Sequence, residues 1–249
     1  MIKPWKIVAL LLIGGAAYSV ALPRDELATY QLKWGFVSVG TVEIRLNANP
    51  AENSDTFAAT LSAKANGLMR RMHDFHTVIK STFPAGVEYS LGYSRDEKAG
   101  EDLHETFIDV EGGEARYSKN GDLRNPVRLL GMTQDPLSIV FAFRSGAVPF
   151  EVGEYQAWVT DGKVVELADF TISGPETIKT AAGKFETLRV TADFKGVRAI
   201  FARPEGALID VWLTNDDRRI PVKLISEATI GSFRSELRAY EGDDAVSEE

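Results

Sequence analysis

Strict alternation of apolar and polar residues runs through most of this chain and limits its fold more than any other feature. Near the N-terminus, Tyr30, Leu32 and Trp34 fall on one side of an extended strand, and Gln31 and Lys33 fall on the other. The same period of two recurs in residues 42–46, 56–65, 104–110, 163–173, 184–194, 198–202 and 207–214. Glycine-containing turn signals separate these segments, so the sequence predicts a mainly β protein with antiparallel strands and not repeated βαβ units.

Gly35 interrupts the alternation. Beyond it the apolar side passes to Val37 and Val39, so we expect a β-bulge at this glycine that reverses which side faces the core. The next strand then carries Val42 and Ile44 on its apolar side.

One segment has a helical pattern instead. Asp135 can cap a helix and Pro136 suits its first position. Apolar residues then recur at helical spacing, at Leu137, Val140 and Phe141. The sequence therefore predicts one short helix over about 135–144, packed on the sheet. A second brief helical turn is predicted over 67–74.

The first 21 residues have the order of a secretory signal peptide. Lys3 and Lys6 precede an apolar run over 7–17, and small residues end the segment at Ala21. The run is too short and too rich in glycine for a membrane span of about 20 residues. We expect cleavage after Ala21, export to the periplasm and no integral span in the mature chain; an uncleaved N-terminal anchor is the alternative.

Cysteine content and charge narrow the class of protein further. The chain of 249 residues has no cysteine, which excludes disulfides, thiolate metal ligands, a thiol nucleophile and a lipid attached through cysteine. Removal of residues 1–21 takes away two lysines and moves the formal net charge from −8 to −10. An acidic chain argues against a nucleic-acid partner, because binders of nucleic acid need basic patches.

The domain organisation is simple. Residues 22–240 contain no linker rich in Pro, Gly or Ser, and we expect them to form a single β-rich domain. Residues 241–249, EGDDAVSEE, have one valine among acidic and small residues. That composition predicts a disordered acidic tail.

Motifs for common catalytic chemistry are missing from the sequence. Neither a G-x-S-x-G elbow nor a phosphate-binding glycine loop occurs. The histidines are His73, His76 and His104, and strand character after Asp74 would turn the first two to opposite faces. We therefore predict no metal site, no cofactor and no nucleotide chemistry.

Carboxylates and tryptophans remain as candidates for a site. Paired carboxylates could serve a hydrolase, although distance along the sequence cannot place two acids in space. Trp34, Trp158 and Trp212 lie in predicted strands and could line a cavity for an apolar ligand, with core packing as the competing use. These three tryptophans are the ligand-binding residues that the sequence nominates.

Residues 210–224, DVWLTNDDRRIPVKL, combine two alternating segments with a charged centre. The charged residues 216–219 suit a solvated hairpin loop, in which an exposed Asp–Arg pair contributes at most about 1 kcal/mol. Pro221 cannot donate to a ladder, so its amide side should face an edge or a bulge. We expect replacement of all four charges by Ser or Asn to leave folding nearly unchanged.

Several stretches together resemble one family of exported bacterial proteins, the domain of unknown function DUF3108. The similar stretches are YQLKWGFVSVGTVEI, DPLSIVFAFR, ETIKTAAGKFETLRV, DVWLTNDDRRIPVKL and GSFRSELRAY. They occur in the family's order and span about residues 28–240.

What the resemblance implies is mainly a fold. Such proteins resemble the lipoprotein carriers of the LolA and LolB type, in which an antiparallel sheet curves into an open half-barrel with a helix over its mouth. The concave face of that architecture is apolar and can shelter acyl chains. The resemblance carries no catalytic residues to this chain.

Three functions follow as hypotheses. The first is a non-enzymatic periplasmic protein that binds an apolar or amphipathic ligand, a lipid or lipid-linked molecule, in the concave face. The second is a structural adaptor that binds another envelope protein through an open sheet edge. The third is a hydrolase of envelope polymers, which would need a polar cleft with two carboxylates of perturbed pKa.

Overall fold

The structure is a computed structural model that describes residues 20–48, 55–72, 74–99, 102–197, 207–227 and 231–242. Its strands are β1 (Asp25–Trp34), β2 (Val37–Ala48), β3 (Thr56–Ala65), β4 (Phe75–Pro84), β5 (Gly92–Ala99), β6 (Asp102–Glu111), β7 (Glu114–Lys119), β8 (Asp122–Leu123), β9 (Val127–Arg128), β10 (Thr133–Gln134), β11 (Gly153–Thr160), β12 (Val165–Thr180), β13 (Gly183–Asp193), β14 (Ile209–Thr214), β15 (Pro221–Glu227) and β16 (Ser232–Gly242). Two helices, α1 (Gly67–Met72) and α2 (Ser138–Ser145), complete the described part of the chain.

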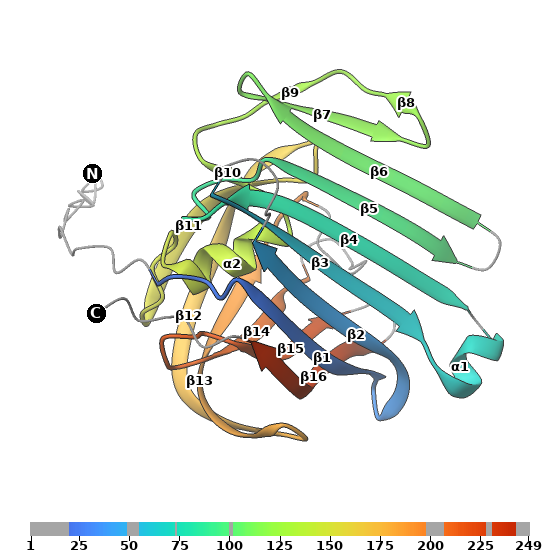
Figure 1. Ribbon diagram of the computed structural model, residues 1–249, viewed down its shortest axis with the longest axis vertical. Helices are drawn as coiled ribbons and strands as arrows, with labels where there is room; N and C mark the ends of the chain where they lie inside the picture. The colour runs from blue at the N-terminus through green and yellow to red at the C-terminus, as the bar shows by residue number, and fades with distance from the viewer. Residues whose placement is uncertain are drawn as a thin grey trace, which may run out of the picture.

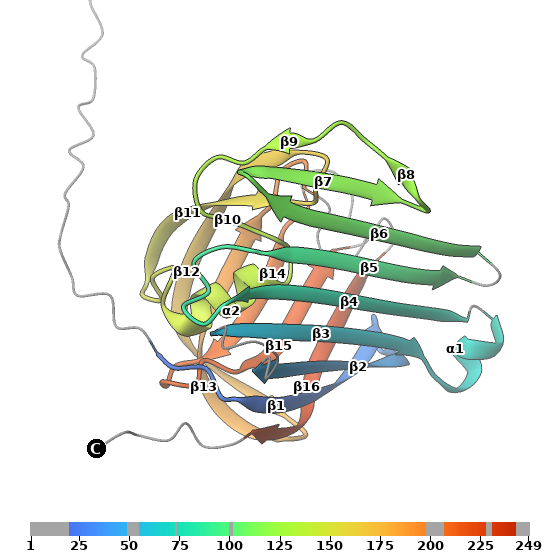
Figure 2. The same ribbon diagram turned by 45° about the horizontal axis from the view of Figure 1, so that its top comes forward.

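All the strands belong to one sheet that curves without closing. Its order is β10-β11-β12-β13-β14-β15-β16-β1-β2-β3-β4-β5-β6-β7-β8, with β9 paired to β7. Two walls of this sheet face each other, β2–β7 on one side and β11–β16 on the other (Figures 1 and 2). The predicted mainly β fold, an open half-barrel with a short helix packed on it, is confirmed.

One pair of strands departs from the antiparallel prediction. β10 runs parallel to β11, with Thr133 opposite Trp158, while the other pairs along the path are antiparallel. A parallel pair needs a crossover connection. The segment that contains α2 lies between β10 and β11 and provides that crossover.

The core lies inside the curve of the sheet, because alternation turns every second side chain inward. In β1 the even-numbered residues from Glu26 to Leu32 are buried, as the sequence predicts for Tyr30 and Leu32. In β3 the buried positions are likewise every second residue, from Phe57 to Ala65.

The irregularity predicted at Gly35 is of a different kind. Gly35 and Phe36 form the turn of the β1–β2 hairpin, and residues 37–48 make one continuous strand. The predicted bulge at Gly35, with a separate strand from Val42, is therefore wrong; the register shift lies between Leu32 and Lys33. A glycine suits this turn because its φ is +57°, which disfavours a side chain.

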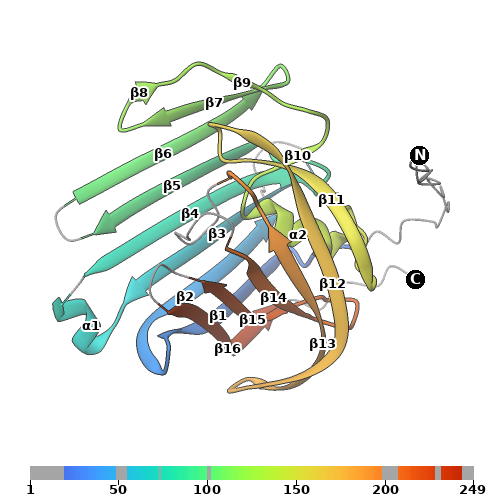
Figure 3. The ribbon, with the colours of Figure 1, turned by 180° about the vertical axis from the view of Figure 1, so that it is seen from behind.

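Helix α2 lies inside the half-barrel, between its walls (Figure 3). It begins at Ser138, three residues after the predicted start, and its C-terminal cap is Gly146 in the left-handed conformation. The ring of Phe141 packs on Phe83 with centroids 5.3 Å apart, and the ring of Phe143 packs on Phe170 at 5.2 Å. These aromatic contacts fix the helix to both walls.

Other sequence predictions have mixed outcomes. The second helical turn is present as α1, and the bulge at Pro221 is present because Trp212 pairs with Lys223 whereas Leu213 pairs with Pro221. β16 extends through Gly242, two residues past the predicted end of the domain. The predicted strand over 198–202, residues 1–19 of the signal and residues 243–249 of the tail lie outside the described residues.

Candidate functional site

The start of α2 is held by one buried carboxylate. Asp135 Oδ1 accepts hydrogen bonds from the backbone N–H groups of Leu137 and Ser138, at 2.7 and 2.9 Å. Its Oδ2 accepts from the hydroxyls of Ser81 and Ser90, at 2.5 and 2.7 Å. Burial raises the pKa of Asp135, and the four donors oppose that effect. Asp135 therefore joins the helix to β4 and to the loop before β5.

Apolar side chains of α2 face two small pockets on the concave side of the sheet. The first pocket lies against β12–β15 and has an entirely apolar lining that includes Ile139, Phe143 and Ala192. The second lies against β1–β3 and β14–β16 and includes Leu137 and Tyr30. Three residues line both pockets: Val140, Val211 and Leu224. The two pockets are therefore neighbours, separated by the side chain that α2 inserts at Val140 and by two residues of the sheet.

Each pocket encloses only about 40 Å³. That space is far below the roughly 300–1,000 Å³ of sites that hold drug-sized ligands. In the arrangement seen here α2 fills the groove, and a ligand the size of an acyl chain would need the helix to move.

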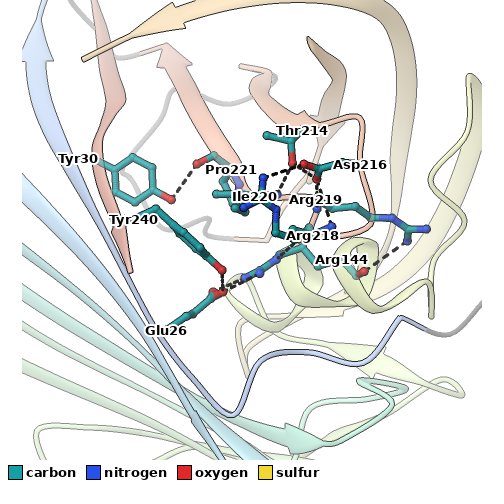
Figure 4. Close-up of polar contacts among 10 residues, drawn as sticks. All are labelled: Glu26, Tyr30, Arg144, Thr214, Asp216, Arg218, Arg219, Ile220, Pro221 and Tyr240. Carbon is teal, nitrogen blue, oxygen red and sulfur yellow. Dashed lines mark hydrogen bonds and ion pairs between the residues drawn. The ribbon is translucent and has the colours of Figure 1, made fainter. Parts of the chain in front are cut away.

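A buried ion pair lies at the C-terminal end of α2 (Figure 4). Arg144 donates from Nη1 and Nη2 to both carboxylate oxygens of Glu26, and each side chain is 2 % exposed. Tyr240 donates its hydroxyl proton to the same carboxylate at 2.9 Å. Burial disfavours the charge of Arg144, but the hydrogen bonds and charge of Glu26 outweigh it and raise its pKa. The pair links α2 to β1.

Two tyrosines flank this carboxylate. Burial and the charge of Glu26 raise the pKa of Tyr30, whose hydroxyl donates to the carbonyl of Pro221 at 2.9 Å. Burial and Glu26 raise the pKa of Tyr240 to about 12. Both phenols therefore stay protonated at neutral pH and act as hydrogen-bond donors.

The loop after β14 rests on α2 as well. Asp216 accepts from the hydroxyl of Thr214 at 2.6 Å and from the backbone N–H groups of Arg218 and Arg219. Arg219 donates from Nη1 to the carbonyl of Phe143 at 2.8 Å, and its guanidinium lies 5.3 Å from the ring centre of Phe150. The predicted hairpin loop is confirmed and residues 215–218 are exposed, but the interpretation of all four charges as a free tip is wrong for Arg219.

A mixed polar and apolar cleft of about 420 Å³ lies beside this cluster. Arg144, Asp217, Arg218 and Tyr240 line it together with residues 20–23. The polar cluster thus stands between the cleft and the apolar pocket that Tyr30 lines. Because Arg144 is fully paired with Glu26, the cleft presents a satisfied ion pair and not an open cation.

The three nominated tryptophans do not converge. Trp212 is 4 % exposed and faces away from Val211 and Leu213, on the outer side of β14, where its Nε1 donates to Glu176 at 2.9 Å. Trp158 is half-buried on β11, and Trp34 is 41 % exposed at the end of β1. None of them lines either apolar pocket, and their role in ligand binding stays a prediction.

The histidines are placed only in part. His76 is exposed on β4, His104 lies in β6, and His73 lies outside the described residues. Over the ranges that the structure describes, no cluster of three or more metal-binding side chains occurs.

Sequence reasoning missed Glu26, Arg144 and Tyr240. A signal for Glu26 exists, because this acid occupies a position that the alternation of β1 turns inward. A buried acid requires a partner, and that requirement could have directed attention to a basic residue on the predicted helix. The location of Glu26 next to Tyr240 depends on the pairing of β1 with β16, which no local sequence pattern predicts.

The fold and the groove define a class: an open β half-barrel whose concave side is apolar and covered by a short internal helix. The family model DUF3108, described as a protein of unknown function, matches residues 29–238. The chain belongs to this family, and the predicted resemblance is confirmed.

One solved structure supports the same architecture. A β-barrel-like protein of the domain of unknown function DUF1849 from Brucella abortus is similar with a TM-score of 0.61 and 13 % identity, over 90 % of this chain and 100 % of that chain. A protein from Parabacteroides distasonis, named as a candidate lipoprotein, has a TM-score of 0.33 and 12 % identity, over 90 % and 99 % of the two chains. Among curated proteins, no sequence matches this chain. Within the described residues, no helix combines the length and hydrophobicity needed to cross a membrane.

Proposed function

We propose that this protein is a non-enzymatic periplasmic protein that binds a lipid or lipid-linked molecule between α2 and the concave face of its sheet. The observation that carries the proposal is the pair of neighbouring pockets that share Val140, Val211 and Leu224. Export rests on the signal-like order of residues 1–21. The molecule it binds is apolar or amphipathic, because the pocket on the β12–β15 side offers no polar side chain to a ligand.

Binding in this groove requires α2 to shift. An outward shift of Val140 would merge the two pockets into one groove along the sheet. The polar contacts of Asp135 and Arg144 hold the two ends of the helix. The apolar middle of α2 is therefore the part that can move. For an amphipathic ligand, the cleft beside Tyr240 offers polar volume for a headgroup, and cleavage after Ala21 would remove Val20 and Ala21 from its lining.

The alternatives receive less support. Strand addition needs a long free edge, whereas β8 is two residues long and β10, which pairs with Trp158 and Val159, leaves only the short segment Gly153–Ala157 of β11 uncovered. A hydrolase with paired acids needs two perturbed carboxyl groups in a cleft. Among the described residues, the carboxyl group with a raised pKa is Asp135, which is 1 % exposed and held by four donors.

Filling the groove tests the proposal. Ala192 is 4 % exposed and lines the first pocket, so Ala192→Leu should occupy the space that an acyl chain would take. We expect this variant to bind cis-parinaric acid, followed by fluorescence titration, at least about tenfold more weakly than the parent. Thr171→Leu adds similar bulk to an exposed position of β12 and should leave the affinity unchanged.

Native mass spectrometry of the protein purified from its host's periplasm gives an independent readout. Copurified lipid mass on the parent, reduced in Ala192→Leu, supports the proposal. A clean apo mass together with no uptake of the fluorescent fatty acid would rule it out.

A further inference from the structure

The tip of the β1–β2 hairpin carries a group of exposed apolar side chains. Phe36 is 99 % exposed, Val37 is 64 % exposed and Trp34 is 41 % exposed. These three residues flank the turn at Gly35, where β1 ends and β2 begins. Single exposed apolar residues are ordinary, but a contiguous group that includes two aromatic rings marks an interaction surface.

Two contacts tie the tip to the segment that begins β16. The N–H of Gly35 donates to the carbonyl of Ser232 at 3.2 Å, which ties the tip to the start of β16. Gly231, with φ of +75°, lies under the indole of Trp34: a Cβ at this position would come within 3.1 Å of Trp34 Nε1. The exposed rings are therefore presented by a hairpin that its neighbours hold in place.

Two cations stand beside the tip. Arg70 and Arg71 are exposed on α1, which packs against β2. Asn66, the residue before α1, donates its backbone N–H to Val39 at 3.0 Å and its side-chain amide to Ser38 at 3.4 Å, so the helix is fixed near the start of β2. The other charges around the tip are balanced in part, since Lys33 and Arg234 both pair with Glu236.

We propose that this end of the molecule, the hairpin tip of Trp34, Phe36 and Val37 with Arg70 and Arg71 beside it, docks on an anionic phospholipid surface. The aromatic and aliphatic side chains would enter the interface between headgroups and acyl chains, where amphipathic rings such as Trp are favoured. The arginines would lie at headgroup level and contact phosphate oxygens. The chain as a whole has a formal net charge of −8 and is repelled by an anionic membrane, so the exposed arginines select which end approaches.

Docking here is separate from ligand binding in the groove, because none of these five residues lines the two apolar pockets. Either property can fail while the other holds. Ala192→Leu, which fills the groove, should dock like the parent.

Vesicle cosedimentation tests the docking surface. The parent should partition onto vesicles of phosphatidylethanolamine and phosphatidylglycerol more than onto phosphatidylcholine vesicles, and added salt should reduce the difference. Phe36→Ser should lower the partition coefficient by about tenfold. Leu123→Ser removes a similarly exposed apolar side chain, 77 % exposed on β8, and should have no effect. All variants are purified in the same form, so any contribution of residues 1–21 is common to them.

Two further measurements decide between membrane docking and other uses of the tip. Vesicles with brominated acyl chains should quench tryptophan emission of the parent, and Trp34→Phe should lose most of that quenching. Arg70→Gln with Arg71→Gln should abolish the preference for anionic vesicles while the melting curve stays unchanged. The proposal is overturned if Phe36→Ser partitions like the parent, or if sedimentation shows a dimer in solution that Phe36→Ser dissociates.

Discussion

At the scale of single residues, the charge of Arg144 depends on one partner. Its guanidinium is buried at the end of α2, and both carboxylate oxygens of Glu26 accept from it. Removing a partner from such a pair leaves an uncompensated charge in the interior, whereas replacing both partners by apolar residues removes the desolvation cost as well. We therefore expect the pair to specify where the helix sits more than it adds net stability.

This leads to a prediction for the two partners. Glu26→Leu and Arg144→Met should each lower the free energy of unfolding by about 3–5 kcal/mol. The double variant Glu26→Leu with Arg144→Met should lose clearly less than the sum of the two single losses. Urea titration followed by circular dichroism measures all of them. Additive losses in the double variant would contradict a direct interaction of this size.

The residues of the site differ in how far sequence can reveal them. Trp34, Trp158 and Trp212 attract attention as large aromatic residues in strands, yet strand position alone does not say which wall or which face each one occupies. Trp212 illustrates the limit, since the inward side of β14 belongs to its neighbours Val211 and Leu213. The apolar lining of the groove consists mainly of ordinary Val, Leu, Ile and Phe residues, which no motif distinguishes from core.

At the scale of elements, the loop between β14 and β15 shows what local pattern can and cannot predict. Alternation on both sides of residues 215–220 locates the hairpin, and the proline predicts the bulge. The contacts of Arg219 with the carbonyl groups of Phe143 and Arg144 come from α2, more than seventy residues earlier in the chain. The loop therefore supports the C-terminal end of α2, and its charges are not equivalent.

We therefore predict different effects for adjacent aspartates. Asp216→Ala removes the acceptor of Thr214, Arg218 and Arg219 and should cost about 1 kcal/mol, the size of a lost capping interaction. Asp217→Ala, at an exposed position with no side-chain hydrogen bond within the described residues, should change stability by less than about 0.5 kcal/mol. Chemical denaturation at neutral pH compares the two.

The shifted pKa of Asp216 predicts how the stability difference between the parent and Asp216→Ala changes with pH. Burial raises the pKa of Asp216, but hydrogen bonds from Thr214 and Arg218 outweigh it and lower the pKa below 3.8. A carboxyl group with a lowered pKa in the folded state stabilises above its unfolded pKa, and that contribution disappears as pH falls through the folded value. The difference between parent and Asp216→Ala should therefore be constant near neutrality and shrink below about pH 4. Equal losses for both aspartates at neutral pH would refute the assignment.

Helix α2 begins later than its sequence suggests, and contacts with residues far away in the sequence accompany this difference. Asp135 and Pro136 have the pattern of a cap and a first position, but the helix starts at Ser138. The carboxylate of Asp135 does bind the N–H groups of Leu137 and Ser138, so the capping chemistry is as predicted. Its second oxygen is occupied by Ser81 and Ser90, and these distant partners fix the geometry of the first turn.

At the scale of the whole molecule, the two ends of the described chain meet in the middle of the sheet. β1 pairs with β16 from Glu26 opposite Gly242 to Trp34 opposite Phe233. The last strand therefore joins the two walls, and Leu237, which is 1 % exposed, contributes to the core. An antiparallel sheet with its first and last strands paired folds through contacts far apart in sequence.

Truncation tests this central pairing. Removal of residues 243–249 should leave the melting temperature unchanged, as expected for a solvated tail. Removal of residues 236–249 deletes most of β16, together with Leu237 and Tyr240, and should abolish cooperative unfolding in circular dichroism because β1 and β15 lose their shared neighbour. A cooperative transition in the longer truncation would show that the walls fold independently.

Period-two alternation in the sequence specified strands, and turn residues separated them. The order of its segments identified the family. Side-chain alternation says which residues share a face but not which strand lies beside which, so the strand pairings are known only from the folded chain. Only the pairing of β1 with β16 brought Glu26, Tyr240 and Arg144 together, and only the curvature of the sheet made an apolar groove out of residues that any β core would contain.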